Sequence, residues 1–215
     1  MLGRLKELLT AFFNPVAFFL IRLGITPNIV TVLGLLLSVF SALFIVGGRL
    51  DPLFHVDEAN RLVIASILLL SSGFCDLLDG LVARMGSMVT AFGGFFDSIL
   101  DRYSEVVFLV TLIYMNYCSA LWGLLALSGS LLVSYARARG EVAGLSGVGV
   151  GLAERPERLL ILSGAVLLQG ILLHNYFASY PIIEVAVIVV ALLSHFTVLQ
   201  RGYYAWTHLQ KIRQT

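Results

Sequence analysis

The 215-residue chain is 59% hydrophobic and 13% charged, with a mean hydropathy of +0.93. Because soluble domains carry about one quarter charged residues, this composition places the chain among membrane proteins. A formal net charge of +1 argues against a general nucleic-acid binder, which would show a large basic excess. The two cysteines, Cys75 and Cys118, cannot define a disulfide framework or a cysteine-rich zinc site.

The N-terminal segment, residues 1–24, combines apolar residues at near-helical spacing with the charged residues Arg4, Lys6, Glu7 and Arg22. These charges, and the lack of a small-residue cleavage site after the apolar part, argue against a signal peptide. We interpret the segment as an amphipathic helix that lies in the membrane interface. A first membrane span is the alternative.

Six later segments are candidates to cross a hydrocarbon core, which requires about 20 residues each. Their apolar centres are Val30–Val46, Leu62–Ala83, Ala91–Met115, Leu121–Ala138, Leu159–Leu173 and Ile182–Gln200. The sequence therefore predicts an all-α integral membrane protein, with six transmembrane helices preceded by an N-terminal amphipathic interfacial helix. We expect a single domain over 1–215, made of the interfacial helix 1–24, a six-span bundle 25–206 and a tail 207–215.

The distribution of Lys and Arg predicts how the bundle is oriented, because basic residues concentrate in cytoplasmic loops. Basic residues precede the first predicted span, lie between the second and third and between the fourth and fifth, and follow the sixth. The connections at the opposite end hold few basic residues. We therefore expect a multi-pass protein of the cell membrane whose termini and basic loops are cytoplasmic.

Four aspartates within the predicted spans are the decisive residues. Asp76 and Asp79 are three apart on one predicted helix, and Asp97 and Asp101 are four apart on the next, so each helix presents its two carboxylates on one face. A short turn joins the two helices, and antiparallel neighbours pack together, so the four acids can converge. We expect Arg84 and Arg102 to offset part of their charge.

An intramembrane aspartate costs roughly 2.5–3.5 kcal/mol on insertion scales, and clustered carboxylates repel one another. A divalent cation would resolve this conflict, and all-oxygen ligation favours Mg²⁺ or Mn²⁺ over zinc. On the acids alone, two other interpretations stay open: a buried Asp–Arg network that holds helices together, and a proton or cation pathway through a transporter.

The residues around the acids narrow the choice. Residues 76–101 carry the pattern D-x-x-D-G-x-x-A-R-x8-G-x3-D-x3-D, formed by Asp76, Asp79, Gly80, Ala83, Arg84, Gly93, Asp97 and Asp101. This pattern resembles, without a departure, the signature of the CDP-alcohol phosphotransferase family. A transporter would give no role to the two glycines and the alanine at these spacings.

The resemblance implies a role for each residue of the signature. Asp76, Asp79 and Asp97 would bind metal, and Asp101 would be the general base and a further metal ligand. The nucleotide of a CDP-linked lipid donor would contact Asp76 and Asp79 together with Gly80, Ala83, Arg84 and Gly93, where small residues let it approach the helix backbone. Asn28 and Thr31, at the start of the first span, resemble the family's residues on the cytidine side.

Further stretches resemble one branch of the family, the phosphatidylinositol phosphate synthases and their archaeal-lipid counterparts. The segment from Ser134 to Glu141 is similar to their S-Y-x-[KR]-A-R-A-E motif, with Gly140 where alanine is usual, and Glu154–Arg158 is similar to E-R-P-E-R. By this resemblance, Ser134, Arg137, Arg155 and Arg201 form a pocket for the phosphate of the acceptor. Several convergent cations suit a dianionic phosphate.

We therefore predict a metal-dependent transferase of phospholipid biosynthesis. It would move a lipid phosphate from CDP-diacylglycerol or CDP-archaeol to inositol phosphate and release CMP. Glycerol phosphate is the alternative acceptor, and a cation or proton transporter is the alternative from another class. The family resemblance also suggests a homodimer, contact with membrane lipid and no nucleic-acid partner.

Overall fold

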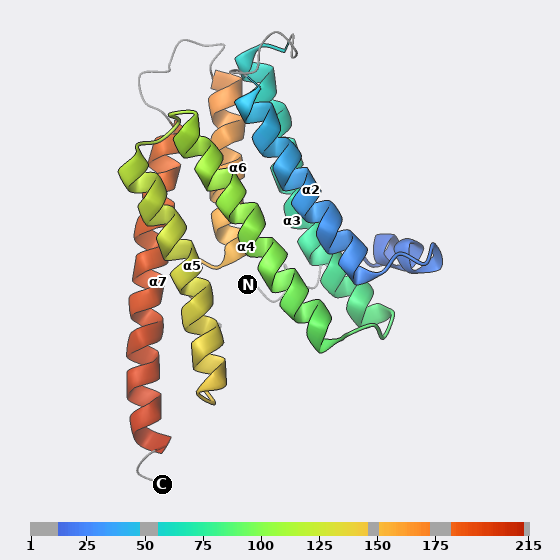
Figure 1. Ribbon diagram of the computed structural model, residues 1–215, viewed down its shortest axis with the longest axis vertical. Helices are drawn as coiled ribbons and strands as arrows, with labels where there is room; N and C mark the ends of the chain where they lie inside the picture. The colour runs from blue at the N-terminus through green and yellow to red at the C-terminus, as the bar shows by residue number, and fades with distance from the viewer. Residues whose placement is uncertain (1–12, 48–55, 146–150, 173–181, 213–215) are drawn as a thin grey trace.

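The computed structural model describes residues 13–47, 56–145, 151–172 and 182–212. All regular secondary structure in these residues is helical, and six long helices run side by side with successive helices in opposite directions (Figure 1). They are α2 (Pro27–Val46), α3 (Glu58–Met85), α4 (Ala91–Tyr114), α5 (Ala120–Val142), α6 (Arg155–Leu172) and α7 (Ile182–Ile212). The first 12 residues of the predicted interfacial helix and residues 213–215 of the predicted tail lie outside the described residues.

Four of these helices, α2, α3, α5 and α7, are long and apolar enough to cross a membrane. The other two, α4 and α6, carry several charged residues yet pack within the same bundle, α4 against α2 and α5, and α6 against α3 and α7. The prediction of an all-helical, multi-pass membrane protein is confirmed. Each predicted span corresponds to one helix, although Met115 follows the end of α4 and Leu173 lies outside the described residues. The α7 helix continues through residues 207–212 of the predicted tail.

Local sequence signals explain where the helices at the site begin. Pro27 stands at the start of α2. A backbone N–H at this position has no acceptor within the helix, so the missing N–H of proline costs no hydrogen bond there. The side chain of Asp57 caps α3 by accepting from the backbone N–H of Asn60 at 3.3 Å. The hydroxyl of Thr90 caps α4 by accepting from the N–H of Gly93 at 2.9 Å. These caps satisfy donors that have no partner within the helix.

Small and hydroxylated residues bring the helices into close contact. The hydroxyl of Ser41 on α2 donates to the carbonyl of Ala65 on α3 at 2.6 Å, and that of Ser38 donates to the carbonyl of Ser104 on α4 at 3.1 Å. At Gly170 on α6, an added Cβ would lie 2.9 Å from the carbonyl oxygen of Ala59 on α3. Lipid tails are as apolar as the helices, so the hydrophobic effect does not drive helices together within a membrane. Close packing and hydrogen bonds of this kind hold them together instead.

A short apolar helix, Phe13–Arg22, lies across the direction of the bundle at the end where α3 finishes (Figure 1). One face packs against α3 through Ala17, which contacts Leu81 and Val82 in a small core cluster. Other faces expose apolar side chains, among them Phe18 at 49% and Phe19 at 60% exposure. Residues 13–22 therefore form a helix with one packed face and one exposed apolar face.

A buried ion pair joins α4 to the start of α6. Arg158 is 1% exposed, and its Nε and Nη2 atoms donate to the two carboxylate oxygens of Glu105 at 2.6 and 2.9 Å. Its Nη1 atom donates to the carbonyl of Ala153 at 2.6 Å. Because each nitrogen of the guanidinium has a hydrogen-bond partner, Arg158 fixes the beginning of α6 against α4.

We expect Arg158→Gln to destabilise the protein by about 3–5 kcal/mol, because it leaves the carboxylate of Glu105 buried without its partner. The matched control is Arg137→Gln, whose ion pair with Glu141 is exposed on both sides at 54% and 57% and is worth at most about 1 kcal/mol. Thermal unfolding of the purified protein in detergent measures both changes. Equal midpoints for the two variants would contradict the structural role of the buried pair.

Candidate active site

The turn between α3 and α4 places the signature residues of the two helices opposite each other. The α3 helix ends with backbone bonds from Gly86 to Val82 at 2.9 Å and from Met88 to Ala83 at 2.9 Å. Ser87 between them has a φ of +53°, a left-handed conformation that reverses the chain. The chain then enters α4 at the Thr90 cap, so the end of α3 and the beginning of α4 lie together.

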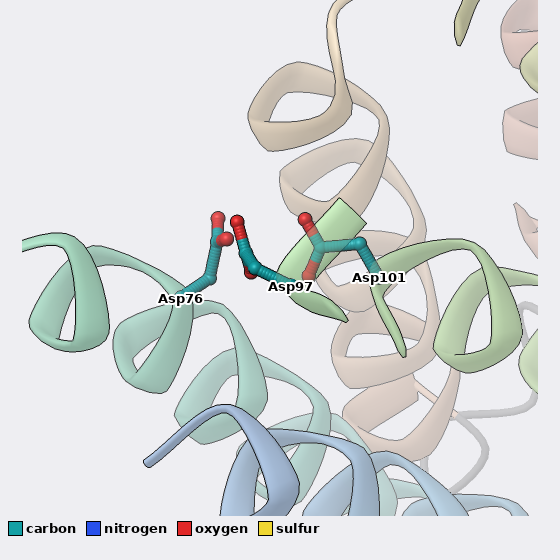
Figure 2. Close-up of side chains that lie close together, drawn as sticks. All are labelled: Asp76, Asp97 and Asp101. Carbon is teal, nitrogen blue, oxygen red and sulfur yellow. The ribbon is translucent and has the colours of Figure 1, made fainter. Parts of the chain in front are cut away.

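Three carboxylates converge where these helices face each other. Oxygen atoms of Asp76, Asp97 and Asp101 all lie within 4.8 Å of one another, and Figure 2 shows the three side chains pointing toward a common space. Each of the three residues is partly buried. The Oδ1 atom of Asp97 is buried and has no hydrogen-bond partner among the described residues. We refer to these residues as the carboxylate cluster.

The fourth signature aspartate, Asp79, lies beside the carboxylate cluster but not within it. Its Oδ2 atom accepts a hydrogen bond from the hydroxyl of Thr31 on α2 at 2.8 Å, and the residue is 5% exposed. Thr31 also donates to the carbonyl of Pro27 at 3.0 Å. The structure thus brings three of the four predicted metal ligands together and ties the fourth to the beginning of α2.

The cation closest to the carboxylate cluster comes from α6. The Nη1 atom of Arg155 lies 2.8 Å from Oδ1 of Asp76 and 2.7 Å from Oδ1 of Asp101. Arg102, which with Arg84 was expected to offset the acids, donates to the carbonyl of Ser98 on its own helix. Arg155 is far from the aspartates in sequence, so only the packing of α6 against α3 brings it to them.

A cavity of about 320 Å³ opens between α2 and the α3–α4 turn. We call it the turn cavity. Its lining includes all the predicted nucleotide-binding residues except Asp76, namely Asn28, Thr31, Asp79, Gly80, Ala83, Arg84 and Gly93. The predicted metal ligand Asp97 lines it as well. Residues from two separate parts of the sequence, 27–31 and 79–97, therefore line one cavity.

The two signature glycines keep the turn cavity open. An added Cβ at Gly80 would lie 3.0 Å from the Nη1 atom of Arg84, so a side chain there would displace the guanidinium. At Gly93 an added Cβ would lie 3.0 Å from the Thr90 hydroxyl and 3.5 Å from the Asn28 side-chain oxygen. Side chains at these positions would crowd the residues that line the cavity.

A second cavity, of about 370 Å³, lies between α4, α5, α6 and α7. We call it the arginine cavity, because Arg102, Arg137, Arg155, Arg158 and Arg201 all contribute to its lining together with Ser134. The four residues predicted to bind the acceptor phosphate are therefore assembled from three helices. Asp97 and Asp101 of the carboxylate cluster also border this cavity.

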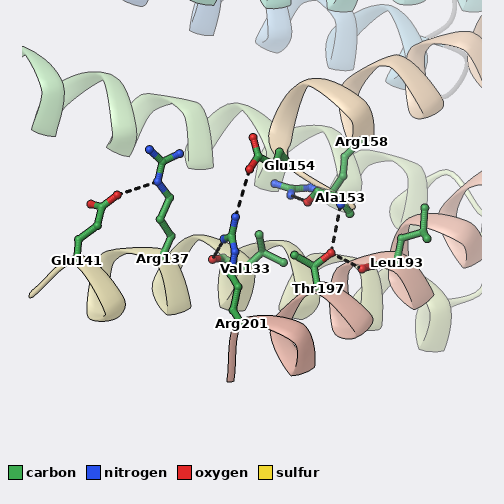
Figure 3. Close-up of polar contacts among 9 residues, drawn as sticks. All are labelled: Val133, Arg137, Glu141, Ala153, Glu154, Arg158, Leu193, Thr197 and Arg201. Carbon is green, nitrogen blue, oxygen red and sulfur yellow. Dashed lines mark hydrogen bonds and ion pairs between the residues drawn. The ribbon is translucent and has the colours of Figure 1, made fainter. Parts of the chain in front are cut away.

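The cations of the arginine cavity are held by carboxylates and carbonyls (Figure 3). Arg201 is 3% exposed; its Nη1 atom donates to the carbonyl of Val133 at 2.6 Å, and its Nη2 atom lies 3.5 Å from an oxygen of Glu154. The Nε atom of Arg137 donates to Glu141 at 2.9 Å. Arg201 is thus held in the interior of the bundle, whereas Arg137 forms its ion pair with Glu141 at the surface.

The two cavities meet at the carboxylate cluster. Asp97 borders both the turn cavity and the arginine cavity. Two molecules bound in these hollows would therefore approach each other at the acids. A site with oxygen ligands at the junction and cations on one side is suited to the transfer of a phosphoryl group between two substrates.

Comparison with known proteins decides the family. A family model described as CDP-alcohol phosphatidyltransferase matches residues 24–199. The chain belongs to the CDP-alcohol phosphatidyltransferase family. It is therefore a transferase, as the signature predicted, and membership in this family decides against the transporter alternative.

Relatives of known name lie in the predicted branch of the CDP-alcohol phosphatidyltransferases. The chain is 36% identical over 211 residues to the archaetidylinositol phosphate synthase of Methanothermobacter thermautotrophicus, with 98% of this chain and 96% of that protein covered. It is 35% identical over 202 residues to the phosphatidylinositol phosphate synthase of Mycobacterium marinum, with 90% and 79% covered.

A solved member of the family has the same fold. The crystal structure of the Mycobacterium tuberculosis phosphatidylinositol phosphate synthase with CDP-DAG bound matches with a TM-score of 0.72 at 30% identity. The match covers 90% of this chain and 93% of that one. The same protein has also been solved in complex with manganese and citrate, again with a TM-score of 0.72.

Some contacts of the site could not be predicted from the sequence. The ion pair of Arg155 with the carboxylate cluster and the contact between Glu154 and Arg201 join residues that are far apart along the chain. The E-R-P-E-R motif marks Glu154 and Arg155 but not the residues that they contact.

Proposed function

We propose that this CDP-alcohol phosphatidyltransferase transfers a lipid phosphate from CDP-diacylglycerol or CDP-archaeol to inositol phosphate and releases CMP. The observation that carries the proposal is that Asp97 borders two cavities, one lined by the signature residues and the other by arginines. The names of the relatives support the acceptor, since both an archaeal and a mycobacterial relative are named as inositol phosphate lipid synthases.

The turn cavity is the site for the cytidine diphosphate part of the donor. Asn28 and Thr31 line the side formed by α2, and Arg84 offers a forked donor suited to diphosphate oxygens. The small residues Gly80, Ala83 and Gly93 let the nucleotide lie against the helix backbone. The crystal structure of the mycobacterial relative with CDP-DAG bound supports a donor of this class.

The carboxylate cluster suits Mg²⁺ or Mn²⁺. Three carboxylates supply oxygens within 4.8 Å of one another, and the buried Oδ1 atom of Asp97 has no hydrogen-bond partner among the described residues. Asp76, Asp97 and Asp101 would hold the ion, with Asp79 next to them as the predicted fourth ligand. Bound there, the cation would supply electrostatic stabilisation of the diphosphate and of the charge that develops on CMP. The manganese complex of the mycobacterial relative supports this choice.

Asp101 is placed to act as the general base, because it borders the arginine cavity in which the acceptor would bind. It would take the proton of the acceptor hydroxyl while that oxygen attacks the lipid-linked phosphorus. The bond between this phosphorus and the bridging oxygen breaks, and CMP leaves with that oxygen. Ser134, Arg137, Arg155 and Arg201 would hold the acceptor phosphate during the transfer.

The whole chain, residues 1–215, would form one catalytic domain in the cell membrane, with α2–α7 as six spans and residues 1–24 as an interfacial helix. The exposed apolar face of residues 13–22 fits the interfacial placement. The site lies at the bundle end that carries Arg84, Arg137 and Arg155, which the positive-inside rule places in the cytoplasm together with both termini. By resemblance to its family, the enzyme would work as a homodimer.

We expect the purified protein in lipid to release CMP from CDP-lipid only when a divalent cation and inositol phosphate are both present. Parallel reactions with glycerol phosphate, serine and free inositol test the acceptor, since the arginine cavity requires a phosphate. Chelation by EDTA should abolish release and added Mg²⁺ or Mn²⁺ should restore it. Faster release with glycerol phosphate than with inositol phosphate would identify a phosphatidylglycerol phosphate synthase instead.

Asp101→Asn is expected to lower kcat by about 10²–10⁴-fold, because the amide cannot accept the hydroxyl proton. Binding of the CDP-lipid should remain near the wild-type level, since Asp101 does not line the turn cavity. Glu141→Gln, at the exposed rim of the arginine cavity, is the matched carboxylate-to-amide control and should retain most of the activity. If Asp101→Asn also loses donor binding, the assignment of a specific base role is wrong.

If the two cavities bind different substrates, a substitution in each cavity should raise the KM for one substrate and leave the KM for the other largely unchanged. Gly80→Ala places a methyl group against Arg84 in the turn cavity and should raise the KM for the CDP-lipid by about tenfold, which corresponds to ~1.4 kcal/mol. Arg137→Gln removes a cation from the arginine cavity and should raise the KM for the acceptor by about 10-fold or more. Steady-state kinetics with each substrate varied separately measure both, and equal changes in the two constants would contradict the assignment.

A further inference from the structure

Arg155 belongs to two parts of the site at once. Its side chain lines the arginine cavity with Ser134 and Arg137, yet its Nη1 atom lies 2.8 and 2.7 Å from the carboxylate oxygens of Asp76 and Asp101. The residue is the first of α6, and its side chain is 18% exposed. Arg155 is thus within reach of both the proposed metal ligands and the proposed acceptor phosphate.

A guanidinium and a divalent cation cannot share these oxygens without a penalty. The same two carboxylates, Asp76 and Asp101, belong to the cluster whose oxygens lie within 4.8 Å of one another. Like charges a few ångströms apart in a poorly solvated site repel strongly, because the low dielectric weakens screening. A cation that binds the cluster therefore has to displace the guanidinium or share the carboxylates with it.

The other arginines of the arginine cavity have partners that do not belong to the carboxylate cluster. Arg201 and Arg158 are held by the backbone carbonyls of Val133 and Ala153, and Arg137 pairs with Glu141. Among the described residues, Arg155 is the one arginine that forms ion pairs with members of the carboxylate cluster. A phosphate in the arginine cavity offers this guanidinium an alternative anionic partner.

We propose that Arg155 competes with the divalent cation for Asp76 and Asp101, and that the phosphate of the acceptor relieves this competition by binding Arg155. The inference rests on the proposed function, since it needs both the metal at the cluster and the phosphate in the arginine cavity. Its consequence is thermodynamic coupling: acceptor and cation each tighten the binding of the other, by the same factor. Arg155 is a positioning residue that favours the state in which the cation and the acceptor are both bound.

The test measures Mn²⁺ binding to the full-length protein in lipid nanodiscs, with the electron paramagnetic resonance signal of free Mn²⁺ as the readout. For the wild-type protein, inositol phosphate should lower the Kd for Mn²⁺ by about tenfold, within the usual range of coupling between sites. Glycerol phosphate should do the same in a parallel arm, whereas free inositol should leave the Kd unchanged. Titrations without protein correct for Mn²⁺ bound directly by the phosphate esters.

Arg155→Gln should bind Mn²⁺ about tenfold more tightly than the wild-type protein without an acceptor, and inositol phosphate should no longer tighten it. Arg137→Gln is the matched control. It removes a cation from the same cavity, but its partner is Glu141, so its Kd for Mn²⁺ without acceptor should equal that of the wild-type protein. A merely structural role for Arg155 would weaken Mn²⁺ binding rather than strengthen it.

The outcomes separate this inference from the proposed function. If Mn²⁺ binds the wild-type protein and Asp97→Asn abolishes binding, the metal site stands. An unchanged or weaker Kd in Arg155→Gln, or no effect of inositol phosphate on the wild-type Kd, would then overturn the coupling alone. The wild-type measurement needs no variant, so a failure of Arg155→Gln to fold leaves the inference falsifiable. Complete loss of Mn²⁺ binding in the wild-type protein would overturn the metal proposal and the coupling together.

Discussion

The structure depends on how a bundle of apolar helices accommodates a group of carboxylates. Each buried aspartate is unfavourable in such surroundings unless a cation or a hydrogen-bond donor stands next to it. Here the partners come from every side of the site: the Thr31 hydroxyl from α2 contacts Asp79, and the Arg155 guanidinium from α6 contacts Asp76 and Asp101. The acids thereby fix the relative placement of α2, α3, α4 and α6.

The same constraint explains why α4 and α6 are less apolar than their neighbours. Both helices contribute charged residues that face one another inside the bundle, most clearly in the buried pair of Glu105 and Arg158. With the carbonyl of Ala153, this pair gives each guanidinium nitrogen of Arg158 a partner and anchors the first turn of α6. Arg155 is the first residue of the same turn, so the anchor also determines where its guanidinium lies next to the carboxylate cluster.

The division of the site into two cavities follows from this packing. The turn cavity is built mostly from residues close in sequence, on either side of the α3–α4 turn, with α2 completing its wall. The arginine cavity is assembled from α4, α5, α6 and α7. Asp97 borders both cavities. A donor in one cavity and an acceptor in the other would therefore meet at this residue, as the reaction of a transferase requires.

The composition of the sequence by itself indicated the helical membrane class, and spacing along adjoining helices indicated which aspartates share a face. The family and the residues of the turn cavity, such as Gly80, Arg84 and Gly93, followed from resemblance to the family signature. Only the tertiary structure decided which cation meets the acids: Arg84 and Arg102 are near them along the chain, but Arg155 contacts them, through the packing of α6 against α3. It also separated Asp79 from the other three aspartates, since the hydroxyl of Thr31 on α2 provides a hydrogen-bond partner that local spacing does not reveal.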